Sequence, residues 1–396
     1  MLCSKDTLMV TRLSLVSCYS LKLSKHLTNY LQGDAKPMSD KISVAVILGG
    51  RSAENYRSCQ SAKDVIDALE EKGYAVSAYG MTLEANWISF GDLNSLKSAL
   101  KKDMFELTDD TAKEIAKTEE SLLPPTSLLE TPVVFSTLMG AWGSDGTMQG
   151  MLETEIIRYV GSDTLGSAIS SDKSTAKLLM EAVEVPTPKH IVIPDKAWRR
   201  DPLSNVARAS SLKVPLISKP ARGSNGVGIT HIRVPRDFKK GIDIARNFDG
   251  RVVVEKYHQP AQLLECNIIE DEKKKPVLSE IIKTNWNEKD KVFNFISRSN
   301  KTSYSFEKAK DLDPEVVKLI HDYAKRTFEV LKLSGYAQIE FMIDKEGELL
   351  VVEVNCQPYF GKDGSFALSW KEAGISYPDL IDRIVKEALD RPAGLI

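Results

Sequence analysis

The chain has 396 residues, of which 42% are hydrophobic and 27% charged, and its formal net charge is −2. This length suits two or three lobes with their own cores, and the near-neutral balance excludes a global basic field that would recruit nucleic acid or a membrane surface. The five cysteines show no CxxC pair and no Cys/His ligand spacing. We therefore expect reduced thiols in a cytoplasmic protein, without a disulfide framework or a zinc site.

The N-terminal segment needs separate treatment. Residues 1–37 are rich in Ser, Leu and Lys and contain few acids, a composition typical of an organelle transit peptide. A disordered extension, or an upstream start with Met38 as the true one, is the simpler interpretation, and we favour it. We exclude residues 1–41 from the fold. No apolar run in the chain is long enough to span a bilayer.

The first predicted domain covers residues 42–150. The apolar run ISVAVILGG (42–50) predicts a buried strand that ends in a tight turn. A helix-like stretch at 61–74 and a strand at 75–83 follow it. Strand, helix, strand is a βαβ unit, so we expect an α/β lobe with parallel strands. The domain ends with a strand and glycine-bearing loop (131–146) and a short helix (148–156).

Two further lobes are predicted, a central one at 151–256 and a C-terminal one at 257–396, which adds an α+β character to the fold class. The central lobe has a helix (173–185), a strand (214–220), a glycine-rich loop (221–228) and two strands (229–234 and 251–257). The C-terminal lobe has two strands (263–270 and 275–282), a polar loop (284–305), a long helix (314–333) and a hairpin (337–355).

A glycine-rich loop follows the strand that ends in Lys219. Gly223, Gly226 and Gly228 lack a Cβ atom, so backbone amides there can approach an anion, and the lysine supplies charge for phosphate oxygens. The loop is not GxxxxGK[ST], and a strand follows it where a Walker loop or a dinucleotide fingerprint requires a helix. A hairpin loop whose glycines serve only turn geometry explains the same pattern.

A carboxylate pair with an asparagine lies in the last hairpin. The turn DKEGE (344–348) makes two strands antiparallel, so Glu340 and Glu353 come close, and Glu353 and Asn355 share one face of the sheet. Two acids at the ends of apolar strands repel each other unless a cation lies between them, and such oxygen ligands suit Mg²⁺. A solvated strand end paired with lysines is the alternative.

Six ordered motifs identify the chain from about Ile42 to its C-terminus as similar to the D-alanine–D-alanine ligase family of the ATP-grasp superfamily. They are VAVILGGRSAE (44–54), GSDGTMQGMLE (143–153), YVGSDTLGSAISSDKSTAK (159–177), SKPARGSNGVGI (218–229), VVVEKY (252–257) and IEFMIDKEGELLVVEVN (339–355). The resemblance implies an ATP-grasp fold, in which the two later lobes enclose ATP. It also implies one or two Mg²⁺ ions, for which Mn²⁺ can substitute.

The resemblance also implies roles for single residues. Lys173 and Lys219 match the lysines that bind the ATP phosphates, Glu54 matches the acid that helps to hold the first amino acid, and Arg298 takes the place of a phosphate-facing loop lysine. The hinge under adenine corresponds to Glu255, Lys256, Tyr257 and His258, the ribose acid to Gln262 or Glu265, and the metal ligands to Glu340, Glu353 and Asn355.

The departures from the family pattern gather on the carboxylate and amine side. Gln338 stands where the family has an oxyanion-hole arginine, Tyr359 where a glycine contributes an amide to the same hole, and Met139 where the amino-acid pocket has a histidine. The loop serines of the family fall at Asn225 and Gly226, and its closing tyrosine falls near Ser299. We interpret the aromatic side chains of Tyr359 and Phe360 as packing that fills space, in preference to stacking on a flat substrate.

We therefore expect an ADP-forming, ATP- and Mg²⁺-dependent carboxylate–amine ligase that acts on small amino-acid or carboxylate substrates through an acyl phosphate. A ligase for another amino acid or a non-peptide acid is the first alternative, and an inactive nucleotide-binding homologue is the second. A dinucleotide oxidoreductase would need a third glycine after Gly49 and Gly50, which the sequence lacks. From the family we also expect a homodimer.

Overall fold

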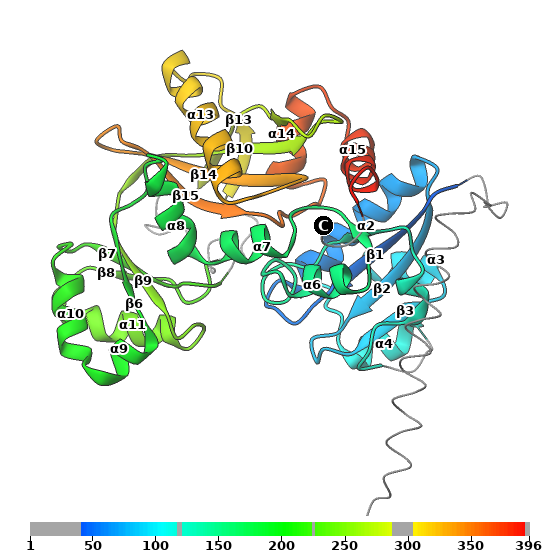
Figure 1. The fold of residues 1–396 in the computed structure, drawn as a ribbon, viewed down its shortest axis with the longest axis horizontal. Helices are drawn as coiled ribbons and strands as arrows, with labels where there is room; N and C mark the ends of the chain where they lie inside the picture. Colours follow the sequence, from blue (N-terminus) through cyan, green and yellow to red (C-terminus); the bar gives the residue numbers. More distant parts are fainter. Residues whose placement is uncertain (1–40, 117–120, 224–225, 287–303, 393–396) are drawn as a thin grey trace, which may run out of the picture. The chain divides into compact units, whose positions relative to one another are not determined.

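The computed structural model describes residues 41–116, 121–223, 226–286 and 304–392. From Ser43 onward the chain forms one compact unit, in which the described strands form three sheets (Figure 1). The mixed α/β fold agrees with the expectation from the sequence. The two domain boundaries predicted inside this unit, at 150/151 and 256/257, stay predictions.

The first sheet is mostly parallel, as the βαβ pattern predicts. β1 pairs in parallel with β2 and with β4, β4 continues in parallel to β5, and β3 pairs antiparallel with β2 at the edge. Val44, Val46 and Leu48 of β1 enter one hydrophobic core, while Ala45 and Ile47 enter another, because both faces of the sheet are covered. The strands in spatial order are β3 (Trp87–Phe90), β2 (Ala75–Met81), β1 (Ser43–Gly49), β4 (Val133–Ser136) and β5 (Arg158–Tyr159). The helices of this region are α2 (Asn55–Glu71), α3 (Leu93–Ala99), α4 (Asp109–Ala116), α5 (Thr126–Leu129) and α6 (Thr147–Thr154).

The strand order reverses between β1 and β4, which is where open parallel sheets bind ligands. The turn after β1 needs glycine, because Gly49 has φ +89° and a Cβ atom there would lie 2.3 Å from the carbonyl oxygen of Met81. The chain then enters α2, which begins at Asn55 and not at Ser61, where the apolar pattern starts. The first turn of α2 therefore lies at the reversal point.

A smaller antiparallel sheet holds the glycine-rich loop. β7 pairs with β8 across that loop and with β9 on its other side, and α11 packs against β7 and β8 through Phe238 and Ile242. The strands in spatial order are β6 (His190–Ile193), β9 (Val252–Lys256), β7 (Leu216–Pro220) and β8 (Thr230–Ile232). Its helices are α9 (Asp195–Arg200), α10 (Pro202–Ser210), the 3-10 turn η1 (Pro235–Asp237) and α11 (Phe238–Arg246).

The largest sheet is antiparallel and carries the predicted hairpin. β10 lies at its centre between β12 and β14, and α8 and α13 cover one face through Met180, Ile320 and Phe328. The main path runs β13 (Tyr304–Lys308), β12 (Ile282–Trp286), β10 (Pro260–Glu270), β14 (Tyr336–Asp344) and β15 (Leu349–Asn355), with β11 (Pro276–Leu278) on β10. The associated helices are α7 (Thr164–Ser171), α8 (Lys173–Ala182), α13 (Pro314–Val330), α14 (Ser365–Glu372) and α15 (Tyr377–Leu389).

Two sequence predictions in this sheet were wrong. The stretch 275–282 is not one strand, because β11 ends at Leu278 and β12 starts at Ile282. The stretch 284–305 is not a loop throughout, since its described ends belong to β12 and β13, which pair through Trp286 and Tyr304. Inward and outward positions alternate along both strands, but a polar residue, Thr284, occupies an inward position of β12, and this hid the period-two pattern of hydrophobicity.

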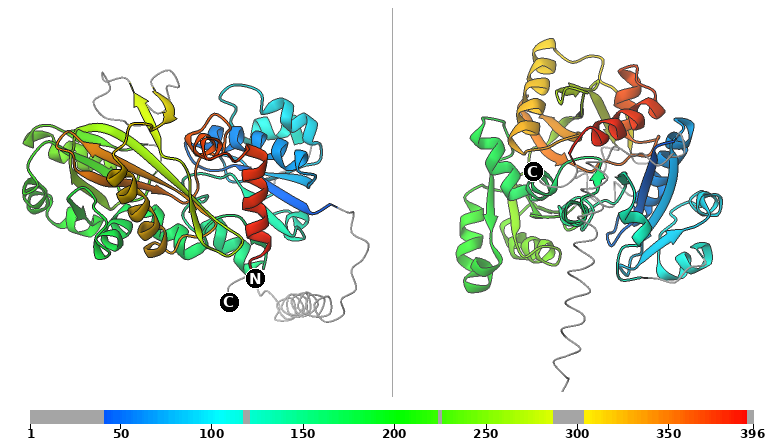
Figure 2. Two further views of the ribbon diagram at one scale, coloured as in Figure 1. Left: turned by 90° about the horizontal axis from the view of Figure 1, so that it is seen from above. Right: turned by 45° about the vertical axis from the view of Figure 1, so that its right-hand side comes forward.

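The last helix returns to the first sheet. Leu380, Ile381, Ile384 and Val385 of α15 share a hydrophobic core with β1 and α2, and α15 lies beside α2 (Figures 1 and 2). Phe360 is buried in the same core, edge-on to other aromatic rings. The interpretation of Phe360 as packing is confirmed.

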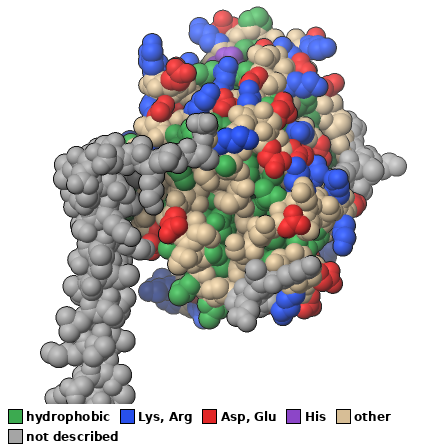
Figure 3. Space-filling view, turned by 90° about the vertical axis from the view of Figure 1, so that its right-hand side faces the viewer, with side chains coloured by type: hydrophobic (Ala, Val, Ile, Leu, Met, Phe, Trp, Pro, Cys, Tyr) green, Lys and Arg blue, Asp and Glu red, His purple; other side chains and the backbone are tan. Residues whose placement is uncertain are grey.

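The surface carries mixed charge. On the face shown in Figure 3, Lys and Arg side chains are interspersed with Asp and Glu side chains among the described residues. In the same part of the chain, no helix is both long and apolar enough to cross a membrane.

Candidate active site

One large cavity of about 1450 Å³ is lined by parts of all three sheets. The loops after β1 and β4 form one wall, α8 and the β7–β9 sheet form a second, and β10, β14 and β15 form a third. A cavity of this size exceeds what one drug-sized ligand needs. It has room for a nucleotide together with smaller molecules.

The cavity gathers nearly all described residues that the sequence predicted for the site. Gln262 lies on β10 but does not line the cavity, and Asn225 and Arg298 lie outside the described residues. The predicted residues that line it are Glu54, Lys173, Lys219, Gly226, Glu255, Lys256, Tyr257, His258, Glu265, Gln338, Glu340, Glu353 and Asn355.

A buried charged trio lies beside the glycine-rich loop. Lys219 Nζ lies 2.6 Å from Glu255 Oε1, and Lys177 Nζ lies 3.1 Å from Glu255 Oε2. Burial by itself would raise the pKa of Glu255, but the two lysines outweigh burial and hold that pKa at about 2. Burial lowers the pKa of Lys177 to about 8, against the opposing effect of Glu255. Two cations against one carboxylate leave a net positive charge facing the cavity.

Lys173 connects the glycine-rich loop to the carboxylate pair. Its Nζ donates to the carbonyl oxygen of Gly223 at 2.5 Å and lies 3.5 Å from Glu353 Oε1. Asp172 caps α8 by accepting from the backbone N–H groups of Ser174 and Thr175, and this fixes where the helix starts. The cap therefore positions Lys173 and, one turn later, Lys177.

The predicted metal residues are neighbours, as the hairpin requires. Glu340 and Glu353 lie opposite each other in the β14–β15 ladder, and Asn355 Nδ2 donates to Glu340 Oε1 and to Gln338 Oε1 at 3.2 Å each. Two facing carboxylates with an amide beside them form a hard-oxygen donor set that fits a divalent cation. In the protein alone, Lys173 and the Asn355 amide provide positive charge and hydrogen bonds to these two acids.

Glu265 lies on the carboxylate side of the cavity, away from the hinge. It pairs with Glu340 in the β10–β14 ladder, and Asn267 Nδ2 donates to its Oε1 at 2.7 Å. Burial raises the pKa of Glu265 to about 7, while hydrogen bonds with Gln338 and Asn267 work in the opposite direction. The residue therefore holds a proton more readily than an ordinary glutamate.

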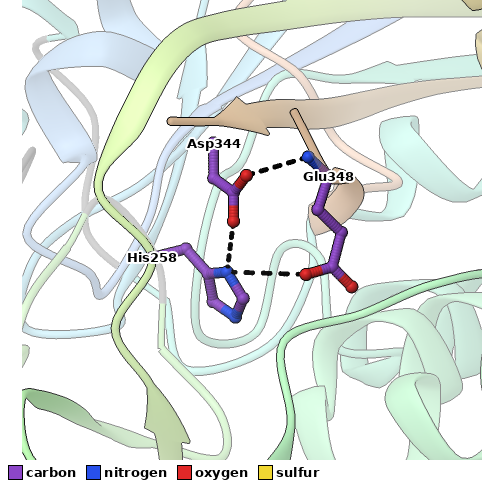
Figure 4. Close-up of side chains that lie close together, drawn as sticks. All are labelled: His258, Asp344 and Glu348. Carbon is purple, nitrogen blue, oxygen red and sulfur yellow. Dashed lines mark hydrogen bonds and ion pairs between the residues drawn. The ribbon is translucent and has the colours of Figure 1, made fainter. Parts of the chain in front are cut away.

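The hinge after β9 is anchored by a histidine (Figure 4). His258 Nδ1 and Asp344 Oδ2 form a hydrogen bond of 2.7 Å, and Asp344 Oδ1 accepts from the backbone N–H groups of Glu346 and Glu348. Burial would raise the pKa of Asp344, but these hydrogen bonds hold it below the ordinary value. Glu348 Oε2 lies farther away, 3.9 Å from His258 Nδ1. Asp344 already takes part in three hydrogen bonds. We therefore interpret His258, Asp344 and Glu348 as an anchor of the hinge and not as a metal site.

The wall from the first sheet carries two charged side chains, each with one buried atom that has no hydrogen-bond partner among the described residues. Glu54 is 4% exposed, and its Oε2 atom accepts no hydrogen bond from any described residue. Nε of Arg57, one helical turn later, donates no hydrogen bond to any described residue, and the Arg57 guanidinium lies 4.5 Å from the ring centre of Tyr359. Tyr359 thus lines the cavity and differs in this from the buried Phe360. The interpretation of Tyr359 as space-filling was incomplete.

Tyr359 offers a backbone donor to the cavity, as the glycine expected at this position would. The N–H group of Tyr359 donates to no described residue, and its side chain packs against Gly361 and Gly364, where a Cβ atom would lie 2.2 and 2.8 Å from the tyrosine. Gln338 is engaged, since its Nε2 donates to Ser365 Oγ at 3.2 Å.

The sequence did not single out three residues of the site. Lys177 follows Lys173 by four positions on one helix, a spacing that predicts a shared face and was a usable signal. Arg57 and Asp344 offered no local signal, because their partners Tyr359 and His258 are far away in the chain.

Comparisons with known proteins agree with this architecture. The chain matches the family models described as D-ala D-ala ligase N-terminus over residues 43–162 and D-ala D-ala ligase C-terminus over residues 179–386. It is 32% identical to a D-alanine–D-alanine ligase of Bacillus pumilus, covering 89% of this chain and 97% of the relative. It is 31% identical to D-alanine–D-alanine ligase A of Bradyrhizobium diazoefficiens, covering 89% and 96%.

Solved structures share the fold at lower sequence identity. The D-alanine–D-alanine ligase of Coxiella burnetii has a TM-score of 0.73 and 21% identity, over 89% of this chain and 95% of that one. The VanG D-Ala:D-Ser ligase of Enterococcus faecalis has a TM-score of 0.72 and 22% identity, over 88% and 100%.

Proposed function

The chain belongs to the D-alanine–D-alanine ligase family, and from this we propose that it forms a peptide bond between two amino acids, one of which is D-alanine. It is an ATP-dependent, ADP-forming carboxylate–amine ligase, and its family uses a divalent metal. D-Alanine is the first candidate substrate because the relatives are named for it.

ATP binding in this proposal uses the charged trio. The triphosphate approaches Lys219 and draws it away from Glu255, because a polyphosphate offers this lysine more negative charge than one carboxylate does. Lys177 stays with Glu255 and keeps that buried carboxylate neutralised. Lys173 then binds a phosphate oxygen between the glycine-rich loop and Glu353.

Adenine in this proposal lies under the hinge formed by Glu255, Lys256, Tyr257 and His258, with His258 held by Asp344. Gly226 of the glycine-rich loop lines the cavity and is proposed to contact the phosphates, and the same role for Asn225 rests on the family resemblance. Of the two residues expected for the ribose contact, Glu265 lines the cavity and is the one we propose, while Gln262 does not line it. The role proposed for Arg298 rests on the family resemblance.

One or two Mg²⁺ ions, or Mn²⁺ in their place, are the metal we propose for Glu340, Glu353 and Asn355. The ions would neutralise the phosphate oxygens during phosphoryl transfer. The donor set supports this, because two facing carboxylates on rigid strands present hard oxygens at one place. Lys173, which lies 3.5 Å from Glu353 in the protein alone, is then available for phosphate.

The reaction has two steps. A carboxylate oxygen of the first amino acid attacks the γ-phosphorus of ATP, which releases ADP and forms an acyl phosphate. The amine of the second amino acid then attacks the acyl carbon, and phosphate leaves with the former carboxylate oxygen. Glu54 accepts the ammonium of the first amino acid, since its buried Oε2 atom lacks another donor among the described residues. The Tyr359 N–H group is the first donor for the oxyanion, and Gln338 becomes a second one when its Nε2 group releases Ser365 Oγ or Glu265.

A homodimer and a cytoplasmic location complete the proposal. The dimer rests on the family resemblance. The location is supported by the free, buried cysteines Cys59, Cys266 and Cys356, which would suit a reducing compartment.

The observation that carries the proposal is the single cavity that combines the lysine trio, the carboxylate pair and the unpaired Glu54. The test is ADP release from ATP and Mg²⁺ with single amino acids and pairs of amino acids, in both chiral forms. We expect ADP release that depends on amino acids and includes D-alanine in the best pair. ADP release that no amino acid stimulates would contradict the proposal.

A further inference from the structure

The start of α2 presents two side chains of opposite charge to the cavity, and these two do not form an ion pair with each other. They are the N-cap residue Glu54 and Arg57 of the first turn. Glu54 and Arg57 are three residues apart, a spacing that puts them on one helix face, and both line the cavity. Side chains of opposite charge at this spacing ordinarily form an ion pair, yet these two form none. Glu54 Oε2 and Arg57 Nε are instead both buried without a hydrogen-bond partner in the described part of the chain.

Buried polar atoms without partners are costly, so their presence in a cavity indicates a ligand that satisfies them. The carboxylate of Glu54 suits a substrate ammonium group. The guanidinium of Arg57 suits an anion, because it presents several donors in a planar fork that matches a carboxylate. The two groups together therefore point to one substrate that carries both charges.

The guanidinium of Arg57 is held in place by the ring of Tyr359, which is itself fixed by its neighbours. It lies 4.5 Å from the ring centre of Tyr359, a cation–π contact. The ring in turn packs on Gly361 and Gly364, and its hydroxyl donates to Asp363 Oδ1 at 2.8 Å and lies 3.4 Å from Gln60 Oε1.

The charged residues near Arg57 interact with other groups, so its guanidinium can bind an anionic ligand. Asp363 accepts the hydroxyl of Tyr359, and Lys362 lies over the ring of Tyr377. No acid among the described residues lies within ion-pair distance of Arg57. The hydroxyl of Tyr56 lies close enough to interact with Arg57, but it is a neutral group.

We propose that Arg57 binds a second anionic group on the first amino acid, so that the preferred donor is an acidic amino acid. This inference rests on the proposed function, because it needs an amino acid whose ammonium lies on Glu54 and whose α-carboxylate faces the nucleotide. The side chain of such an amino acid then points along α2 towards Arg57. A short side chain that ends in a carboxylate spans the distance between neighbouring helical positions, about 5–6 Å.

The experiment tests donors without an acceptor amino acid. Hydroxylamine attacks the acyl phosphate in place of the amine, and the acyl hydroxamate that forms reports only which donor was activated. The donors are D- and L-aspartate, D- and L-glutamate and D- and L-alanine. Asparagine and glutamine, also in both chiral forms, are the uncharged side-chain amides that match the two acids. We expect an aspartate or glutamate to exceed alanine and the matching amide in kcat/KM.

Variants sharpen this test. Arg57→Gln should reduce kcat/KM for the acidic donor by about 10- to 100-fold, the value of a charge-assisted hydrogen bond, and should reduce it for the matching amide by much less. Arg57→Lys should restore part of the loss, because lysine keeps the charge without the fork. Arg51→Gln is the control, since Arg51 also lies over an aromatic ring, Trp142, but does not line the cavity.

Two results would overturn the inference and leave the ligase intact. One is a wild-type enzyme that activates alanine better than every acidic donor. The other is an Arg57→Gln variant whose losses are equal for acidic and uncharged donors, which would assign Arg57 to the reacting carboxylate. The wild-type donor panel decides the matter even if Arg57→Gln does not fold. Absence of hydroxamate and of ADP with every donor would instead contradict the proposed function itself.

Discussion

The nucleotide side and the amino-acid side of the cavity satisfy their charges in different ways. On the nucleotide side, Lys219 and Lys177 flank Glu255, and Lys173 lies beside Glu353. On the amino-acid side, Glu54 Oε2 and Arg57 Nε are buried without a hydrogen-bond partner, and neither residue forms an ion pair among the described residues. A ligand on the nucleotide side replaces existing ion-pair partners of the lysines. A ligand on the amino-acid side supplies the first hydrogen-bond partners of Glu54 Oε2 and Arg57 Nε. The first side should therefore depend on every member of its network, and the second should determine substrate choice.

The largest effect is expected at the lysine that changes partner. Lys219→Ala removes a phosphate ligand and leaves Glu255 with one cation, so we expect kcat/KM for ATP to fall by about 1000-fold, as for the loss of a strong electrostatic contact in a transition state. Steady-state ADP release measures it. The control is Lys239→Ala, because Lys239 pairs with Asp243 on the surface. Turnover that survives Lys219→Ala would refute the assignment of this lysine.

A somewhat smaller effect is expected at the carboxylate pair. Glu353→Gln keeps the shape of the side chain but removes a negative charge opposite Glu340. We expect the Mg²⁺ concentration for half-maximal rate to rise about 10- to 100-fold, the range seen when metal sites lose a supporting group. Titration of the rate with Mg²⁺ measures it, and Glu315→Gln, at an exposed position, is the control. An unchanged Mg²⁺ dependence would exclude Glu353 as a ligand.

The pH dependence of ATP binding tests the partner exchange. The pKa of Lys177 is lowered to about 8 in the folded protein, so its charge is present below pH 8 and is lost above it. Without that charge Glu255 cannot release Lys219 to phosphate, and we expect KM for ATP to rise about tenfold between pH 7 and pH 9. Lys177→Arg should keep KM low in this range, because arginine stays charged. A KM that rises equally in wild type and Lys177→Arg would show that another group titrates.

The same shift affects stability with a defined sign. Between pH 8 and pH 10.5 the unfolded state binds the Lys177 proton more tightly than the folded state does. The contribution of Lys177 to the free energy of unfolding should therefore increase as pH rises through this window. Comparison of denaturant unfolding of wild type and Lys177→Met at pH 7 and pH 10 measures it, and equal pH dependence of the two proteins would contradict it.

The smallest effect is expected at the hinge anchor. Asp344→Asn weakens the hydrogen bond with His258 and those from the hairpin turn, and we expect a loss of about 1–2 kcal/mol in the free energy of unfolding. KM for ATP should rise only a few-fold, because the hinge loses an anchor and no ligand contact. Thermal unfolding and ATP kinetics together measure it. A loss of activity as large as that of Lys219→Ala would mean that this pair acts in the chemistry.

How much of the site the sequence predicts depends on how far apart the partners lie in the chain. The approach of Glu340 to Glu353 follows from a short turn between two apolar strands, and the structure has it. The pairing of Lys173 with Glu353 and of Arg57 with Tyr359 requires contacts across the whole fold, which no local pattern encodes. The prediction of a loop at 284–305 was wrong because β12 and the edge strand β13 contain many polar residues and give weak apolar signals.

The most direct test of the central claim follows one oxygen atom. The donor amino acid identified by the hydroxamate assay is supplied with ¹⁸O in both oxygens of its α-carboxylate, and the inorganic phosphate formed is analysed by mass spectrometry. The ligase mechanism predicts one ¹⁸O atom in each phosphate molecule, because the carboxylate oxygen that attacks ATP leaves with the phosphate. Phosphate without ¹⁸O would show that no acyl phosphate forms and would contradict the account.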